Sequence, residues 1–251
     1  MRCAIVSDIH GNLDALEAVL ADAGEVDQFW CLGDLVGYGP QPNECIEALR
    51  SRAALCVAGN HDWAAIGKMD TAEFNPEASE AALWTGARLT DENRHFLATL
   101  PEQVVAGDSG EFTLVHGSPR DPIWEYLTHV SLARLNFDYF QTPYCLVGHT
   151  HVPLVFERPL SEGRGPNYRT IVPEADQAMP LGPARLIVNP GSVGQPRDGN
   201  PQAAYMRYES DGAGTATMTL RRIAYPVATV QQKMRAAGLP PRLITRLTYG
   251  W

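Results

Sequence analysis

Short apolar runs alternate with amphipathic stretches along the first part of the chain. Residues 2–7 form an apolar run that predicts a strand, and leucine and valine side chains then recur at helical spacing over 13–20. Residues 28–32 and 53–58 predict two further strands, with a helix over 42–50 between them. This alternation of strands and helices is typical of a parallel sheet covered on both faces. Ligand sites in such sheets lie beyond the carboxyl ends of the strands.

The middle of the chain is richer in helical patterns, and strands return after it. Asn75 as a cap and Pro76 at the first helical position open a helix that we expect to reach about residue 89, and a second helix covers about 90–100. The later predicted strands cover 104–105, 112–116, 144–147, 152–156, 168–172, 185–189, 203–208 and 216–223, and helices over 226–237 and after Pro240 close the chain. We expect segment 160–166 to be an exposed loop in a single domain that spans residues 1–251.

The composition narrows the class of protein. Hydrophobic residues make up 45% and charged residues 20%, as in ordinary soluble enzymes. No apolar run approaches the roughly 18 residues of a membrane span, and the N-terminus lacks a signal-peptide pattern, so we expect a cytoplasmic protein without a membrane partner. The five cysteines show no CxxC spacing and are predicted to be buried free thiols. The formal net charge of −9 argues against binding to long nucleic acid.

Residues that can bind metal ions follow five of the predicted strands. In chain order they are Asp8 and His10, Asp34, Asn60, His116, and the pair His149 and His151. Strand ends on one rim of a sheet can converge on a single point. Asp8 and His10 are two residues apart, as are the paired histidines, and in extended backbone that spacing points both side chains the same way. We therefore expect one shared centre.

The types of ligand favour a site for two metal ions. Oxygen and imidazole donors without thiolate suit manganese, iron, zinc, cobalt or nickel, and seven ligands are too many for one tetrahedral ion. Two divalent ions bring four positive charges, of which the two aspartates cancel only two. The remaining charge can stabilise a metal-bound hydroxide together with a phosphate, as in-line phosphoryl displacement requires. We predict two divalent metal ions, manganese first among these, and hydrolysis of a phosphate ester.

Taken in order, these motifs resemble those of the calcineurin-like metallophosphoesterase superfamily. Segment 189–193, with the sequence Asn-Pro-Gly-Ser-Val, is similar to a strand and turn of its small bacterial phosphodiesterase branch. The resemblance covers residues 1 to about 195. It implies an α/β fold in which a two-sheet β-sandwich is flanked by helices (α/β/β/α), with the metal site in the loops above the strands.

The resemblance also implies a role for each residue. The ligands of the first metal would be Asp8, His10 and His151, those of the second Asn60, His116 and His149, and Asp34 would bridge the two. A metal-bridging hydroxide would attack phosphorus in line. His61, next to a metal ligand, would be the catalytic acid that protonates the leaving alkoxide.

One departure from the superfamily bears on the substrate. Its protein phosphatases carry the motif Gly-Asp-x-x-Asp-Arg-Gly, whose second aspartate orients the histidine acid and whose arginine binds phosphate. Both residues are missing from the stretch Gly33 to Gly39 of this chain, so a protein phosphatase is disfavoured and the orienting partner of His61 is unidentified. Arg197 is a candidate substitute cation. Asn12, which is expected to cap the first helix, is a second candidate for contact with substrate phosphate.

Several functions stay open at this point. The favoured one is a phosphodiesterase, or a phosphomonoesterase, that acts on a small phosphate ester or nucleotide. A nuclease, a dinucleoside polyphosphate hydrolase or a protein phosphatase on the same fold is the first alternative. A catalytically silent metal-binding scaffold is the second, although such relatives typically lose ligands or the acid histidine, and this chain keeps them all. Formation of homo-oligomers also stays open.

Overall fold

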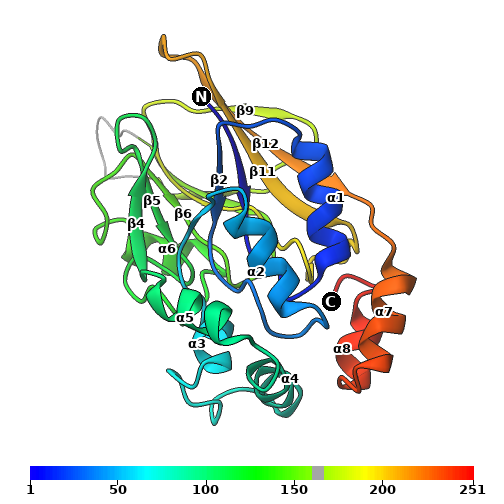
Figure 1. Ribbon diagram of the computed structural model, residues 1–251. Helices are drawn as coiled ribbons and strands as arrows, with labels where there is room; N and C mark the ends of the chain where they lie inside the picture. The colour runs from blue at the N-terminus through cyan, green and yellow to red at the C-terminus, as the bar shows by residue number, and fades with distance from the viewer. Residues whose placement is uncertain (160–166) are drawn as a thin grey trace.

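Two sheets of six strands each form the centre of the computed structural model, which describes residues 1–159 and 167–251 (Figure 1). The first sheet contains β1 (Arg2–Val6), β2 (Gln28–Cys31), β3 (Leu55–Cys56), β9 (Ala178–Pro180), β11 (Ala203–Ser210) and β12 (Ala216–Ile223). The second contains β4 (Gln103–Ala106), β5 (Phe112–Val115), β6 (Tyr144–Leu146), β7 (Leu154–Arg158), β8 (Arg169–Ile171) and β10 (Arg185–Asn189). The helices are α1 (Leu13–Ala23), α2 (Pro42–Arg50), α3 (Asn60–Ala65), α4 (Pro76–Gly86), α5 (Asp91–Thr99), α6 (Val130–Asn136), α7 (Val227–Ala236) and α8 (Pro241–Arg246).

Parallel strands occupy the part of each sheet that leads to the site. In the first sheet, with strand order β3-β2-β1-β11-β12-β9, strand β1 pairs in parallel with β2 and β2 with β3, as predicted. In the second, with order β4-β5-β6-β10-β7-β8, strand β6 lies parallel between β5 and β10. The other pairings are antiparallel. The carboxyl ends of β1, β2, β3, β5 and β6 therefore deliver their loops to one rim.

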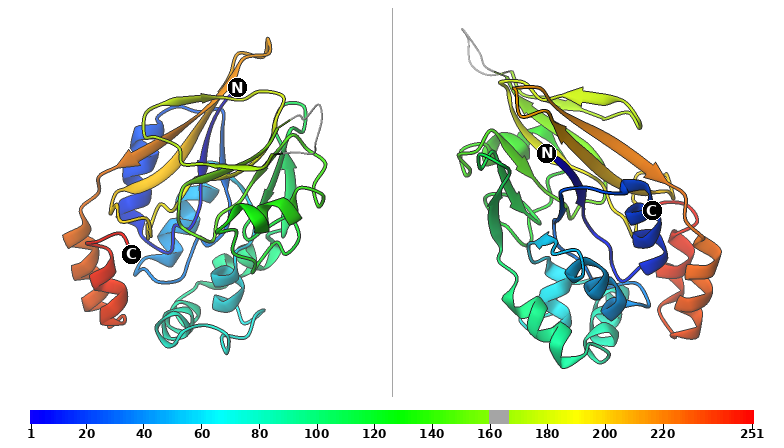
Figure 2. Two further views of the ribbon diagram at one scale, coloured as in Figure 1. Left: turned by 180° about the vertical axis from the view of Figure 1, so that it is seen from behind. Right: turned by 45° about the horizontal axis from the view of Figure 1, so that its top comes forward.

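The two sheets pack face to face and helices cover their outer faces. Trp30, Phe112 and Tyr208 meet between the sheets, where the ring centroids of Trp30 and Phe112 are 5.1 Å apart. Helices α1 and α2 cover the first sheet with their buried leucines and valines (Figure 1). Helix α6 covers the second sheet and comes to the front when the molecule is seen from behind (Figure 2). This arrangement confirms the predicted α/β/β/α sandwich.

Some boundaries differ from the sequence prediction. Strand β3 keeps only two of the six predicted residues, since Ala53 has a left-handed φ of 49° and the Ala58 amide donates to Pro101 instead of to β2. Helices α3 and α6 and strand β9 were not delimited by the sequence patterns. The loop predicted at 160–166 lies outside the described residues. None of the helices in the described part of the chain combines the length and the apolar character that crossing a membrane demands.

Helices α7 and α8 extend the fold beyond the sandwich. After β12 the chain turns away from the first sheet, and the two helices pack together at the end of the molecule where the metal-binding loops lie (Figures 1 and 2). Val230 and Met234 of α7 and Leu243 of α8 share an apolar cluster with Ala81 of α4 and with Tyr38. Residues from the last part of the chain are thereby held next to the loop that follows β2.

Candidate metal centre

The loops that follow β1, β2, β3, β5 and β6 meet at one rim, as predicted. All seven predicted ligands are buried there: Asp8, His10, Asp34, Asn60, His116, His149 and His151. Six of them form two clusters of potential metal ligands, one of Asp8, His10, Asp34 and His151 and the other of Asp34, His116 and His149. Asn60 lies beside the second cluster, with its Oδ1 3.1 Å from His116 Nε2. The ligand atoms of each cluster lie within 4.8 Å of one another. Asp34 belongs to both clusters, so its carboxylate can bridge two ions.

The backbone that brings these residues together differs from the extended conformation we expected. Positive φ values occur at five of the ligands: Asp8 (53°), His10 (51°), Asp34 (54°), His149 (66°) and His151 (61°). The paired ligands thus share a direction because they sit in tight loops, and the explanation from extended backbone was wrong. A left-handed conformation costs a non-glycine residue about 1–3 kcal/mol and persists only where the surroundings enforce it. Strain of this kind is concentrated at this rim.

Distances between the side chains agree with two neighbouring ion positions. His151 Nε2 lies 3.2 Å from Asp8 Oδ1 and 3.1 Å from His10 Nε2. On the other side, His116 Nε2 lies 3.1 Å from Asn60 Oδ1 and 3.0 Å from His149 Nδ1. One oxygen of Asp34, Oδ2, reaches both groups, at 3.6 Å from His10 Nε2 and 3.5 Å from His116 Nε2. The ligand atoms of each group are close enough together to bind a common cation.

Each aspartate uses one oxygen within the protein and leaves the other for a cation. Asp8 Oδ2 accepts hydrogen bonds from the Ser7 hydroxyl at 2.6 Å and the His149 amide at 3.1 Å. Asp34 Oδ1 accepts from the His61 amide at 2.9 Å. Asp8 Oδ1 and Asp34 Oδ2 are buried and have no hydrogen-bond partner among the described residues. Buried carboxylate oxygens without partners are costly unless a cation is bound, so these atoms fit divalent metal ions.

The four histidine ligands are oriented by backbone carbonyl oxygens. In each ring the nitrogen facing away from the centre lies near a carbonyl: His10 Nδ1 at 3.2 Å from Val36, His116 Nδ1 at 2.8 Å from Leu32, His151 Nδ1 at 2.6 Å from Gln195, and His149 Nε2 at 3.1 Å from Trp124. The ring nitrogen that donates to a carbonyl carries the proton. The other nitrogen then presents its lone pair inward, which is the tautomer that a metal ligand needs.

Burial sets the charge state of the same histidines. It lowers the pKa of His10 and His149 well below the ordinary value and that of His151 to about 4, and neighbouring cationic groups act in the same direction. The imidazoles are therefore neutral near pH 7. Burial, followed by the neighbouring Asp62 and Asp8, raises the pKa of Asp34. Bound cations would offset this crowding of carboxyl groups.

Two glycines are required by the close approach of these loops. A Cβ atom at Gly59 would lie 2.1 Å from Asp34 Oδ1, and one at Gly148 would lie 2.0 Å from the Ser7 hydroxyl oxygen. Any side chain at either position would displace an aspartate ligand or its hydrogen-bond donor. The glycines that accompany the metal-binding motifs in the sequence therefore have a steric explanation.

His61 lies beside the two clusters and not within either. Its ring centroid is 4.9 Å from that of His10, 4.5 Å from that of Tyr38 and 4.9 Å from that of Phe74. His61 Nδ1 is buried without a hydrogen-bond partner among the described residues, so an orienting partner remains unidentified. A Cβ atom at Gly37 would lie 2.9 Å from this nitrogen. The stretch that lacks the phosphatase aspartate thus packs directly on the histidine.

The Asp62 carboxylate accepts hydrogen bonds from backbone amides of the loops that follow β2 and β3. Its carboxylate accepts from the amides of Asp34 at 2.8 Å, Gly59 at 2.9 Å and Val36 at 3.2 Å. Burial raises the pKa of Asp62 to about 7, against the lowering effect of these amides. These contacts give Asp62 a structural role in holding the loops after β2 and β3 together.

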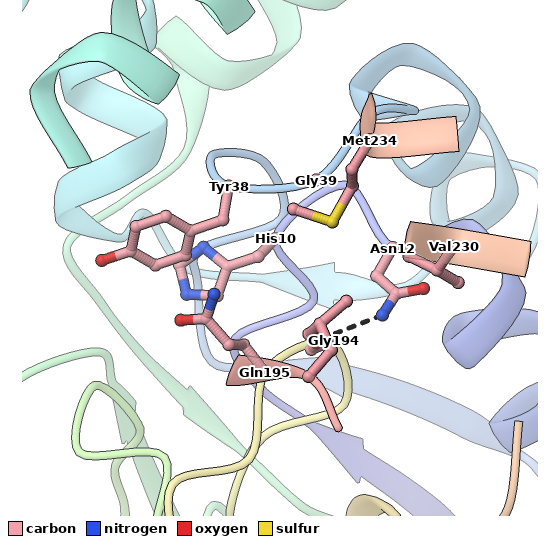
Figure 3. Close-up of a pocket in the computed structure, with 9 residues that line it drawn as sticks. His10, Asn12, Tyr38, Gly39, Gly194, Gln195, Val230 and Met234 are labelled. Carbon is pink, nitrogen blue, oxygen red and sulfur yellow. Dashed lines mark hydrogen bonds between the residues drawn. The ribbon is translucent and has the colours of Figure 1, made fainter. Parts of the chain in front are cut away.

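The two predicted substrate-binding residues, Asn12 and Arg197, line different pockets beside the centre. Asn12 caps α1, because its Oδ1 accepts from the Ala15 amide at 3.2 Å, and its Nδ2 donates to the Gly194 carbonyl at 2.9 Å (Figure 3). Val230 and Met234 line the same pocket as Asn12 (Figure 3). Arg197 donates to the Tyr38 hydroxyl at 3.3 Å, and the Tyr38 ring packs on His10, so its charge lies near the centre. Burial is the main cause of the lowered pKa of His10 and His61, and the charge of Arg197 adds to it. A contact of either residue with substrate stays a prediction.

Sequence reasoning assigned no contacts to three further residues at the site, Asn189, Ser192 and Tyr126. The Ser192 hydroxyl donates to the Asp8 carbonyl at 2.8 Å, and Asn189 Nδ2 donates to the Gly148 carbonyl at 2.6 Å, so segment 189–193 braces two metal-binding loops. The Tyr126 ring lies over His149, with 3.7 Å between the centroids. Segment 189–193 was noticed in the sequence as a motif, but its contacts depend on the pairing of β10 with β6. No sequence signal marks Tyr126.

The geometry agrees with comparisons to known proteins. The profile of the calcineurin-like phosphoesterase superfamily domain matches residues 1–212. The crystal structure of a metallophosphoesterase from Sphaerobacter thermophilus superposes with a TM-score of 0.85 at 46% identity, covering 100% of this chain and 99% of that one. An uncharacterized protein of Methanocaldococcus jannaschii, MJ0912, is 36% identical over 257 residues, 98% of this chain and 97% of its own length.

A relative with a named activity is the phosphodiesterase YfcE of Escherichia coli, which is 27% identical over 240 residues, 91% of this chain and 98% of its own length. The match covers every predicted metal ligand and all strands of the described structure except β12. The buried clusters of aspartate and histidine supply the donors for divalent metal ions. The chain belongs to the calcineurin-like phosphoesterase superfamily, whose members are metal-dependent phosphoric ester hydrolases.

Proposed function

We propose that this protein is a phosphodiesterase that uses two divalent metal ions, manganese first among them, to hydrolyse a small phosphodiester. The observation that carries the proposal is the carboxylate of Asp34, which belongs to both ligand clusters and leaves Oδ2 without a hydrogen bond among the described residues. When bound, two divalent ions would supply an activated water and offset the charge of the phosphate. The relative YfcE, named a phosphodiesterase, supports the choice of ester.

The protein's own residues would orient and stabilise the reacting groups. Asp8, His10 and His151 would hold one ion, and Asn60, His116 and His149 the other. Their backbone and hydroxyl partners fix them before substrate arrives, so little reorganisation is needed during the reaction. Arg197, beside Tyr38, would add positive charge for the substrate phosphate. Asn12 would act mainly by fixing the start of α1 next to the Asp8 loop.

His61 would donate the proton to the leaving oxygen. Its ring is buried beside the centre, and its Nδ1 packs against Gly37, so Nε2 would be the nitrogen that meets a substrate oxygen. Burial and then Arg197 lower the pKa of His61 in the absence of substrate. A bound phosphate brings negative charge close to the ring, which raises the pKa and favours the protonated form.

Hydrolysis of bis(p-nitrophenyl) phosphate by manganese-loaded protein tests the proposal. We expect turnover of this diester to exceed that of p-nitrophenyl phosphate, to disappear with a chelator and to return when manganese is added. Metal content must be measured on the same sample. Protein that holds its metal but hydrolyses neither ester would refute the enzyme. A preference for the monoester would make it a phosphomonoesterase.

The remaining expectations follow the same assignment. We propose a cytoplasmic enzyme whose partner is a small phosphate ester or nucleotide, since the net charge of −9 disfavours long nucleic acid. Replacing manganese by iron, zinc, nickel or cobalt in otherwise metal-free protein would rank the metals by turnover and by affinity. Size-exclusion chromatography with light scattering would show whether the chain forms homo-oligomers.

A further inference from the structure

A polar cavity opens next to the metal centre. Its volume is about 180 Å³, and Tyr38 and Tyr126 form its walls on the side of the centre. The Tyr38 ring centroid lies 4.5 Å from that of His10, and the Tyr126 centroid lies 3.7 Å from that of His149. A group in this cavity would therefore be separated from the metal ligands by about the breadth of one aromatic ring.

Three arginines line this cavity. Arg197 follows the brace segment 189–193, whereas Arg242 and Arg246 come from α8 near the end of the chain. Glu77 is the one acidic residue among the described residues that line the cavity, and its Oε1 lies 3.6 Å from Arg242 Nη1. Three positive charges against one negative charge leave an excess of two in a protein whose net charge is −9. Such a cavity attracts anions.

Arg197 and Arg246 carry N–H groups that no hydrogen bond uses among the described residues. Arg197 Nε is buried without a hydrogen-bond partner among the described residues. Arg246 donates through Nε to the backbone oxygen of Trp251, and no bond within the described part of the chain engages its two terminal nitrogens. Burial, followed by the charge of Arg197, lowers the pKa of Arg246 to about 10. An anion between the guanidinium groups of Arg197 and Arg246 would offset the repulsion between their positive charges. It would also accept hydrogen bonds from their free N–H groups.

We propose that this cavity binds a second phosphate group of the substrate, so that the enzyme acts on phosphodiesters that carry a further phosphate. Arg242 and Arg246 are the specificity-determining residues, and Arg197 lines the cavity beside Tyr38, whose ring packs on His10. Planar guanidinium groups suit phosphate because they can donate two parallel hydrogen bonds. The second phosphate is either a separate ester on the same molecule or part of an anhydride. This inference rests on the proposed phosphodiesterase function.

Matched chromogenic substrates test the inference on the manganese-loaded full chain. The reference is the p-nitrophenyl ester of thymidine 5′-phosphate. One test ester carries an added 3′-phosphate, and the other has a 5′-diphosphate in place of the phosphate. We expect at least one of them to show kcat/KM about tenfold above the reference, mainly through a lower KM. Whichever ester gains identifies the source of the second phosphate.

Variants then assign the gain to the cavity. Arg242→Gln and Arg246→Gln should bring the ratio of kcat/KM between test and reference esters close to one. The Arg242 side chain is 81% exposed, so its replacement should not unfold the protein. Arg235→Gln, an exposed arginine on the neighbouring α7, is the matched control and should keep the full ratio.

The outcomes separate the two proposals. If the reference ester is not hydrolysed, the phosphodiesterase function fails. If it is hydrolysed and neither test ester is preferred, the second phosphate site is refuted while the enzyme stands. A preference that persists in both arginine variants would also refute the site, because the gain would then come from elsewhere.

Discussion

At the residue scale, the centre depends on how two carboxylates divide their oxygens. Asp8 and Asp34 each accept hydrogen bonds within the protein through one oxygen and leave the other unpartnered among the described residues. The aspartates are therefore fixed in direction before a metal binds. Asp34 contributes to both ion positions, since it belongs to both ligand clusters, whereas Asp8 belongs to one.

Replacing the bridging carboxylate should affect both metal sites. Asp34→Asn removes a negative charge from each, so we expect the affinity for both ions to fall more than about tenfold. The raised pKa of Asp34, caused by burial and then by Asp62 and Asp8, favours a protonated carboxyl in metal-free protein. An amide resembles that form, so the metal-free variant should fold normally. Metal per chain after equilibrium dialysis is the measurement, with the exposed Asp70→Asn as control. Unchanged content of both ions would contradict the bridge.

Removal of the proposed acid should separate chemistry from metal binding. We expect His61→Ala to keep its metal and to lose about 10²- to 10⁴-fold in turnover of alkyl esters, whose leaving groups need a proton. The loss should be smaller for p-nitrophenyl esters, whose leaving group departs as a stable anion. His95→Ala, at an exposed position of α5, is the control. If metal were lost together with His61, the residue would be a ligand, and the assignment as acid would be wrong.

Local conformation at this scale could not be read from the sequence. The spacing of Asp8 and His10 suggested extended backbone, whereas both have φ values near 50°, at 53° and 51°. The strain is enforced by contacts from distant segments, such as the Ser192 hydroxyl on the Asp8 carbonyl, 184 positions away. Residue types and their order therefore predicted which groups come together at the rim. The loop geometry that aims them required the folded chain.

At the scale of elements, patterns with local causes were predicted well. Helix α2 has the predicted bounds, with Pro42 in its first turn and Arg50 in its last. Helix α3 was missed because six residues hold too little periodicity, and its start is stabilised by Asp62 bonds to the Gly59 and Asp34 amides. The two-sheet architecture itself came from the resemblance. The periodicity alone indicated only a parallel sheet.

The contact between α1 and the central strands makes a pH-dependent prediction. Asp22 of α1 accepts two hydrogen bonds from Arg221 of β12, at 2.7 and 3.0 Å, and one from the Tyr205 hydroxyl at 2.7 Å. Bonding to Arg221, partly opposed by burial and aided by Tyr205, lowers the pKa of Asp22 below its ordinary value of 3.8. The ionised carboxylate stabilises the fold, so its contribution is present above the unfolded pKa and is lost as pH falls through the folded one.

Asp22→Asn should therefore destabilise the protein only where the carboxylate is charged. Because the site is partly exposed, we expect a loss of about 1 kcal/mol near neutral pH, measured by urea unfolding. The difference from the natural chain should shrink as the pH falls below about 4. Asp138→Asn, whose side chain is 81% exposed and pairs with Arg158, is a control that should change stability less. A difference that is constant with pH would exclude the ion pair as its cause.

At the scale of the whole molecule, metal binding joins the two sheets. The ligands come from loops of both, with Asp8 and Asp34 following strands of the first sheet and His116 and His149 following strands of the second. Ions bound across this junction favour the folded state by mass action. The apolar cluster that links α7 and α8 to α4 also supports the proposal that residues 1–251 fold as a single domain.

Thermal unfolding with and without metal tests both points. We expect one cooperative transition for the chain, and a higher Tm with manganese than with a chelator. At a free metal concentration about one hundred times Kd, the stabilisation should be about 2.7 kcal/mol. Asp34→Asn should reduce this increase in Tm. Two separate transitions in the metal-free protein would show that the C-terminal helices unfold independently and would contradict a single domain.

The position of α8 has a consequence for how this enzyme could diversify. The predicted metal ligands end at His151, whereas Arg242 and Arg246 are delivered by a six-residue helix close to the last residue. In the proposed enzyme, the residues that bind the metals and those that select the substrate thus lie in separate stretches of the chain. Exchanging only the final helix between relatives should redirect the enzyme to other compounds while its catalytic apparatus stays intact.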